Sequence, residues 1–115
     1  MSKAELKLRM RLTVGEVIAV GPGKIALLEA LAEAGSITAA AKQLDMSYRR
    51  AWLLIDELNR ALAEPAVCTA QGGVRGGGSK LTPTGERLVK LYREIEKKAL
   101  AHCEGPIREL QRMLR

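Results

Sequence analysis

The segment from Gly35 to Arg60 constrains the fold more than any other stretch, because it reads as two helices joined by a very short turn. The run Ala39-Ala-Ala41 in the first helix is small enough to let a second helix cross it closely. Asp45 and Met46 form the expected turn. Two helices that cross over so short a turn are typical of a helix-turn-helix motif.

Hydroxyl side chains mark where both helices are expected to begin. Ser36 and Ser47 stand where a side chain can accept a hydrogen bond from a free N–H of the first helical turn. After Ser47, apolar residues recur at helical spacing and predict a buried stripe of Ala51, Ile55, Leu58 and Leu62. The second helix is therefore expected to start at Ser47 and to pack one face on the first.

The start of the second helix carries side chains that suit a DNA major groove. Arginine pairs bidentately with guanine, and hydroxyl groups bond phosphates or base edges. We expect base contacts from Ser47, Tyr48, Arg49 and Arg50, and phosphate contacts from Ser36 and Thr38 at the N-terminus of the first helix. Alanine-rich helical hairpins also occur in proteins that bind no DNA, so a purely structural hairpin remains the alternative.

Composition favours one α-rich domain and a polyanionic partner. Hydrophobic residues make up 47% of the 115-residue chain but aromatic residues only 3%, so Leu, Ile, Val and Ala must build the core. Leucine and alanine also favour helix. Nineteen Lys and Arg against thirteen Asp and Glu give a net charge of +6, which suits a nucleic acid without proving one.

Cysteine usage and hydropathy exclude several classes. Cys68 and Cys103 form no C-x-x-C pair, so we expect neither a disulfide scaffold nor a zinc site. The N-terminus lacks a signal-peptide pattern, and no run approaches the roughly 18 apolar residues of a membrane span. We therefore expect a cytoplasmic protein without a membrane partner.

A hairpin is expected at the N-terminus. Apolar and cationic residues alternate from Leu6 to Leu12, which predicts a half-buried strand. Gly15-Glu16 is the expected turn and Val17–Val20 the returning strand. The outward cations are Lys7, Arg9 and Arg11, and we expect them to protect the sheet edge from aggregation rather than to contact DNA. An apolar central helix then follows from about Ile25 to Ala34 and ends at a glycine.

A second hairpin is expected directly after the motif, where it has the form of a wing. Glu64-Pro65 ends the preceding helix, and short strands are predicted at Val67–Ala70 and Lys80–Thr82 around a glycine-rich tip. Arg75 and Lys80 are expected to meet phosphates or the minor groove. The glycine run lacks the order of a nucleotide-binding loop, and a plain flexible linker is the alternative to a wing.

The last third of the chain reads as a long amphipathic helix. Thr82-Pro83 opens it, Gly105-Pro106 is expected to break it near residue 103, and a short terminal helix follows. Such a helix beyond a DNA-binding unit suits dimerisation, although packing on its own domain is the alternative. The expected dimerisation residues are Leu88, Leu91, Tyr92, Ile95 and Ala99.

We find no catalytic constellation, and we expect no cofactor, no metal site and no enzymatic activity. The adjacent His102, Cys103 and Glu104 point about 100° apart on a helix and cannot converge on one ion. Asp56 and Glu57 are expected to be solvated on the outer face of the motif's second helix. Trp52 is expected to pack in the core, against the wing or the first helix, rather than on a base.

Several of these segments together resemble the DNA-binding domain of ModE-type molybdate-responsive regulators, a LysR-like winged helix-turn-helix. The resemblance spans about Leu6 to Ala99 and depends on Gly35-Ser-Ile, Ala39-Ala-Ala41, Met46-Ser-Tyr-Arg-Arg-Ala-Trp52, Glu57-Leu-Asn59, the glycine-rich wing and Leu81-Thr82…Gly85. It implies a homodimer, joined largely through the helix after the wing, on a palindromic operator. Asp45 departs from the family by standing where glycine is common. Because the chain ends at Arg115, we expect no oxyanion-sensing domain in it.

The sequence thus predicts a mainly α fold with small β-hairpins, a winged helix-turn-helix with a long C-terminal dimerisation helix. Residues 1–83 form the DNA-binding domain, with the motif at 36–63 and the wing at 66–82, and residues 84–115 form the dimerisation segment. The expected function is dimeric, sequence-specific transcription regulation on double-stranded DNA. The alternatives are an interaction module or sequence-neutral architectural DNA binder that works with a separate sensor, and a small sensor that uses Cys68 or Cys103.

Overall fold

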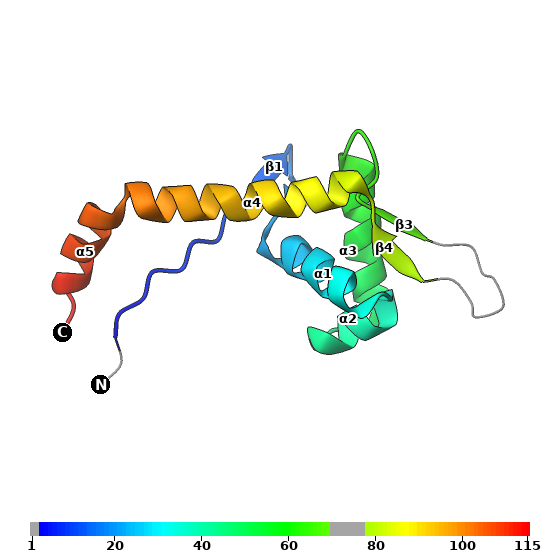
Figure 1. The fold of residues 1–115 in the computed structure, drawn as a ribbon, viewed down its shortest axis with the longest axis horizontal. Coiled ribbons are helices and arrows are strands. Elements are labelled where there is room, and N and C mark those ends of the chain that lie inside the picture. Colours follow the sequence, from blue (N-terminus) through cyan, green and yellow to red (C-terminus); the bar gives the residue numbers. More distant parts are fainter. Residues whose placement is uncertain (1–2, 70–77) are drawn as a thin grey trace.

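A computed structural model describes residues 3–69 and 78–115, and within these ranges it confirms a mainly α fold with two small antiparallel hairpins (Figure 1). The elements in chain order are β1 (Leu12–Val14), β2 (Val17–Val20), α1 (Pro22–Ala34), α2 (Ile37–Gln43), α3 (Tyr48–Ala61), β3 (Val67–Thr69), β4 (Ser79–Leu81), α4 (Pro83–His102) and α5 (Glu104–Arg112). Helices α1, α2 and α3 form a compact unit, and α4 crosses it and projects far beyond it (Figure 1).

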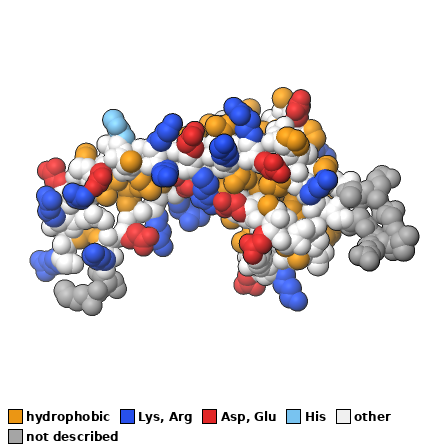
Figure 2. Space-filling view, in the orientation of Figure 1, with side chains coloured by type: hydrophobic (Ala, Val, Ile, Leu, Met, Phe, Trp, Pro, Cys, Tyr) orange, Lys and Arg blue, Asp and Glu red, His pale blue; other side chains and the backbone are white. Residues whose placement is uncertain are grey.

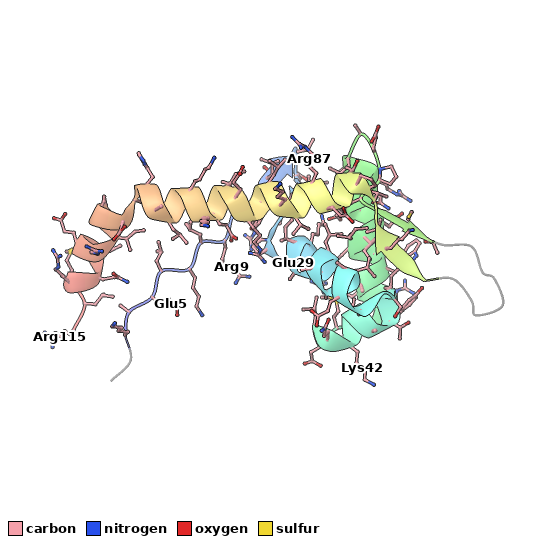
Figure 3. The ribbon with its side chains drawn as sticks, in the orientation of Figure 1. Glu5, Arg9, Glu29, Lys42, Arg87 and Arg115 are labelled. Carbon is pink, nitrogen blue, oxygen red and sulfur yellow. The ribbon has the colours of Figure 1, made fainter. Side chains whose placement is uncertain are left out.

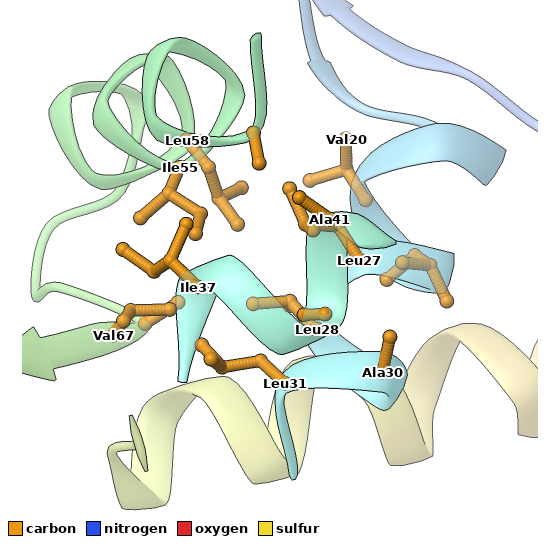
Figure 4. Close-up of a cluster of buried hydrophobic side chains, with 14 of the residues drawn as sticks. Val20, Leu27, Leu28, Ala30, Leu31, Ile37, Ala41, Ile55, Leu58 and Val67 are labelled. Atoms are coloured by element: carbon orange, nitrogen blue, oxygen red, sulfur yellow. The ribbon is translucent and has the colours of Figure 1, made fainter. Parts of the chain in front are cut away.

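The core lies where α1 meets α2, α3, the base of the wing and the first half of α4 (Figure 4). The predicted apolar helix, α1, lies at the centre of this core. Its largest apolar side chains are at most 1% exposed: Ile25, Leu27, Leu28 and Leu31. Helix α1 ends at Gly35, as predicted; this residue has a φ of +79°, and its N–H donates to Leu31 O at 2.8 Å. A left-handed C-cap of this kind favours glycine.

The predicted N-terminal strand is wrong over most of its length. Residues 3–11 have no regular secondary structure, and pairing begins only at Leu12, which is 68% exposed. The predicted turn at Gly15 and the returning strand β2 are confirmed. The reason is that β2 has only four residues, so residues before Leu12 have no strand beside them.

The N-terminal segment lies along α4 and α5 instead (Figure 1). Tyr92 Oη donates to Met10 O at 2.9 Å, and Gln111 Nε2 donates to Ala4 O at 2.8 Å. Helix side chains thus satisfy carbonyls that a sheet would have used. Since residues 7–11 form no strand, the predicted edge-protecting role of Lys7, Arg9 and Arg11 is also wrong.

Helix α4 begins as predicted and ends at His102, one residue before the predicted end at Cys103. Thr82 Oγ1 accepts from Gly85 N at 3.1 Å, and Pro83 occupies the first turn. The break falls at Cys103, and Gly105-Pro106 lies inside the first turn of α5. Proline is tolerated there because the first N–H groups of a helix have no partner within it.

An ion-pair cluster joins α4 to α1 on the side of α4 that faces the core (Figure 3). Arg93 donates from Nε and Nη2 to the two carboxylate oxygens of Glu29, at 2.9 and 2.5 Å, and from Nη1 to Glu96 at 2.7 Å. These hydrogen bonds from Arg93 hold the pKa of Glu29 below its usual value of 4.5. The cluster therefore adds to the apolar packing that holds α4 against α1.

We predict that Glu29→Gln lowers stability at neutral pH by about 0.5–1 kcal/mol, a small value because the carboxylate is 39% exposed. The folded-state pKa is lowered, so this stabilisation is present above pH 4.5 and is lost as the pH falls through the folded-state pKa. Urea denaturation at pH 7 and pH 3 checks this. Glu94→Gln, which removes an exposed carboxylate of α4, is the control; an equal loss in both variants would contradict the prediction.

Candidate nucleic-acid interface

Both predicted helix caps of the motif are present. Ser36 Oγ accepts from Ala39 N at 3.1 Å, and Ser47 Oγ accepts from Arg50 N at 3.1 Å. Each serine hydroxyl keeps its own proton to donate. The caps fix the starts of α2 and α3, which are the ends predicted to meet DNA.

The turn between α2 and α3 is a Schellman motif with Asp45 in the glycine position. Met46 N donates to Ala41 O at 2.9 Å, and Asp45 N donates to Lys42 O at 3.2 Å. Asp45 has a φ of +55°, in the left-handed region that glycine favours and aspartate tolerates. Met46 packs against the core. The departure from the family pattern therefore leaves the turn geometry intact.

The predicted stripe of α3 is confirmed, and Arg49 and Arg50 lie off it, whereas Tyr48 stands at its edge, one turn before Ala51. Ala51, Ile55 and Leu58 are at most 6% exposed, and Leu62 is half-buried. Tyr48 is 54% exposed, and Ser47, Arg49 and Arg50 are exposed as well. Ser47, Arg49 and Arg50 line a shallow cleft of about 320 Å³ together with Leu53, Leu54 and Glu57.

The prediction for Trp52 is right about its neighbours and wrong about its burial. Its indole lines a small pocket with Ile37, Val67 and Thr69, between α2 and the wing, but 46% of the residue is exposed. The next residue, Leu53, is 49% exposed. The reason is that each helical residue turns about 100°, so both follow Ala51 onto the open side of α3.

Glu57 is not the freely solvated carboxylate that the sequence predicts. It forms an ion pair with Lys24 of α1, whose side chain is only 5% exposed and which also donates to Ile18 O of β2. Asp56 pairs with Arg60 at 3.0 Å. The sequence did hold a signal for this ion pair: Lys24 stands next to Ile25, at the start of the most apolar helix. A lysine buried there needs a partner of opposite charge.

The wing is confirmed over its described strands. Val67 pairs with Leu81 and Thr69 with Ser79, so β4 begins one residue earlier than predicted. Asn59, which sequence reasoning missed, attaches the wing to α3: its Nδ2 donates to Val67 O at 3.1 Å, and its Oδ1 accepts from Ala66 N at 2.8 Å. Lys80 is exposed on β4. Arg75, predicted to contact phosphates, lies outside the described residues, as does the wing tip.

Two further observations concern the described ranges 3–69 and 78–115. No three His, Cys, Asp or Glu side chains gather there as metal ligands, and Cys68 and Cys103 are free and exposed. No described helix is long and apolar enough to cross a membrane.

Comparison with protein families matches residues 23–86 to the bacterial regulatory helix-turn-helix proteins of the lysR family, which covers α1, the motif, the wing strands and the start of α4. The chain belongs to this family. The match begins at Gly23 and ends at Glu86, so the β1–β2 hairpin and most of α4 lie outside the matched region.

This LysR-type domain is similar to molybdenum-related regulators. It is 46% identical over 77 residues to the molybdenum-pterin-binding protein MopB of Rhodobacter capsulatus, covering 67% of this chain and 28% of MopB. It is 41% identical to the molybdenum transport protein ModE of Azotobacter vinelandii (84% and 36%) and 38% identical to the transcriptional dual regulator ModE of Escherichia coli (84% and 37%). The resemblance to ModE-type regulators is thereby confirmed, and these relatives agree with a regulator rather than an enzyme.

A solved structure agrees with the fold of the domain. The crystal structure of ArgP from Mycobacterium tuberculosis matches with a TM-score of 0.51 and 28% identity, over 75% of this chain and 31% of ArgP. The chain spans only about a third of the length of the relatives it matches.

We predict an asymmetry between the two partners of the buried ion pair. Glu57→Leu leaves the Lys24 ammonium buried without its counter-charge and is expected to cost about 3 kcal/mol. Lys24→Met leaves Glu57, whose side chain is 51% exposed, free to hydrate, so the expected cost is about 1–2 kcal/mol.

Thermal and urea unfolding of the two single variants and the double variant check this asymmetry. We expect the double variant to recover part of the loss of Glu57→Leu, because no unpaired charge remains buried. Equal costs for the two single variants would contradict the prediction.

Proposed function

We propose that this chain is the DNA-binding part of a dimeric, sequence-specific transcriptional regulator similar to ModE, with α3 in the major groove. One observation carries the proposal: the capped first turn of α3 presents Tyr48, Arg49 and Arg50 to solvent, while the buried stripe further along α3 fixes the helix in the core. A rigid helix with two exposed guanidinium groups at its N-terminal end suits guanine edges in a major groove.

Hydroxyl and cationic groups on either side of α3 serve as phosphate anchors in this proposal. Ser36 and Thr38 stand at the start of α2, and Lys80 stands on the wing strand β4, with Arg75 in the same role. Contacts of this kind fix the register of the protein on the duplex and carry no sequence information.

Dimerisation through α4 completes the proposal and makes the operator palindromic. A groove of about 560 Å³ runs between α4 and the N-terminal segment, lined by apolar residues including Met10, Leu12, Leu88 and Leu91. Leu91 and Ile95 are 40% and 53% exposed, whereas Tyr92 is buried within its own chain. Figure 2 shows hydrophobic side chains on this lower side of α4, interspersed with charged ones. Leu88 and Ala99, both half-buried, flank the exposed pair on the same face of α4.

We predict that selection of bound duplexes from a random pool recovers an inverted repeat with half-sites about one helical turn apart. On that operator, Arg49→Ala or Arg50→Ala is expected to cost about 1–3 kcal/mol and to relax the preference at one base pair. Lys80→Ala is expected to weaken all duplexes alike and to lower the salt dependence of binding.

Affinities of the three variants for the operator and for single-base-pair variants, each at two salt concentrations, provide the measurement. A uniform loss in all three variants would refute the assignment of readers and anchors. Recovery of no motif, with steeply salt-dependent binding to every duplex, would indicate a sequence-neutral binder instead.

We predict that Ile95→Glu converts a two-chain particle into a single chain in sedimentation, because it places a charge in an apolar interface. Operator affinity is expected to fall with it, since each monomer then engages only one half-site. Ala101→Glu is the control: it adds the same charge to an exposed position on the other side of α4. A stable dimer of Ile95→Glu would contradict this interface.

A further inference from the structure

We propose that Trp52 and Leu53, here called the apolar patch, recognise the C5-methyl groups of thymine in the major groove. The inference rests on the proposed function, because it assigns a ligand to a part of α3 that the arginines do not occupy. It adds apolar readers of A·T pairs to the polar readers of G·C pairs.

Both residues of the apolar patch are exposed to solvent, although α3 has a buried apolar face. Trp52 is 46% and Leu53 49% exposed, in the middle of a helix whose buried face is already filled by Ala51, Ile55 and Leu58. The patch adjoins the ring of Tyr48, which is 54% exposed and stands one turn before Trp52. Trp52 lines the pocket beside the wing and Leu53 lines the cleft beside Arg49 and Arg50, so two large apolar side chains stay open on neighbouring faces of α3. Such exposure points to a ligand with apolar groups of its own.

The charges around the patch favour a polyanion over a protein as the occupant. Leu53 lies three and four residues after Arg50 and Arg49, and all three line the same shallow cleft. Arg60, on the same open side two turns further on, is 79% exposed. The two carboxylates beside the patch are each paired with a cation, Asp56 with Arg60 and Glu57 with Lys24. Apolar atoms between guanidinium groups match a groove in which base edges lie between two rows of phosphates.

Thymine is the one base that offers such a patch a partner. Its C5-methyl group is the only apolar group on the major-groove edges of the four bases. Leu53 has no donor or acceptor, so placing it against any other base edge would remove water from a polar group without replacing the hydrogen bond.

Residues of the wing strand β3 lie beside the Trp52 side chain and restrict its orientation. Its indole lines the pocket that Val67 and Thr69 of β3 share with α3, and Asn59 fixes that strand to α3. The wing therefore orients the indole before DNA arrives, and less side-chain entropy is lost on binding.

The test uses the operator recovered by selection, with each thymine replaced in turn by deoxyuridine, which removes the methyl group and leaves the hydrogen-bonding edge unchanged. For the unmodified protein we expect affinity to fall about fourfold at each contacted thymine, the value of one buried methyl-sized group. In Leu53→Ala or Trp52→Ala, the loss at the thymine that this side chain contacts is expected to disappear.

Leu53→Ala is the decisive variant, because an exposed leucine is not needed for folding, whereas Trp52→Ala also alters the wing pocket. Leu110→Ala is the matched control: Leu110 is 58% exposed but lies on α5, and the response of this variant to deoxyuridine is expected to equal that of the unmodified protein.

Deoxyuridine without effect on the unmodified protein would overturn the inference and leave the proposed function standing. A loss that persists unchanged in Leu53→Ala and Trp52→Ala would also overturn it, since other side chains would then contact the methyl groups. Recovery of no preferred duplex would overturn the proposed function, and the methyl contacts with it; binding of the patch to a protein would then be the remaining explanation.

Discussion

The buried ammonium group of Lys24 connects the three parts of the domain that must keep one geometry. It belongs to α1 and binds both Ile18 O of β2 and the carboxylate of Glu57 on α3. Removing such a charge from water is costly, and the cost is offset only when both partners stay in place. Apolar packing tolerates small rotations of a helix, whereas this ion pair does not. The direction in which Arg49 and Arg50 point therefore depends on a contact made two turns further along α3.

Much of the motif was predictable because its signals are local. Capping serines, the spacing of Ala51, Ile55 and Leu58, and Pro83 at a helix start each depend on a few neighbouring residues. The failures concern partners distant in the chain. Alternation before Leu12 fits a strand, but no strand lies beside it; Glu57 looks solvated until α1 brings Lys24 to it. The 100° rotation per helical residue could have predicted that Trp52 turns away from the buried stripe. The prediction of burial came from the residue type, because tryptophan is buried on average.

The candidate interface divides the surface of α3 by chemistry. One face is buried, a second carries Asn59 and Trp52 beside the wing, and a third carries Arg49, Arg50 and Leu53. The buried and wing-facing side chains hold α3 in place, and the side chains on its open side are available to a ligand. The far side of the molecule from α4, where Figure 3 places Lys42, takes no part in the proposed dimer.

The contacts of the N-terminal segment have a consequence for the order of folding during synthesis. Tyr92 donates a hydrogen bond to the carbonyl of Met10, and Gln111 donates one to the carbonyl of Ala4. The residues synthesised first therefore bond to side chains that lie 82 and 107 positions later in the chain. The helix-turn-helix and β2 need only residues up to about 85 and can pack while the chain is still growing. The segment docks last, on a domain that is already folded, and its docking closes the longest loops in the described structure.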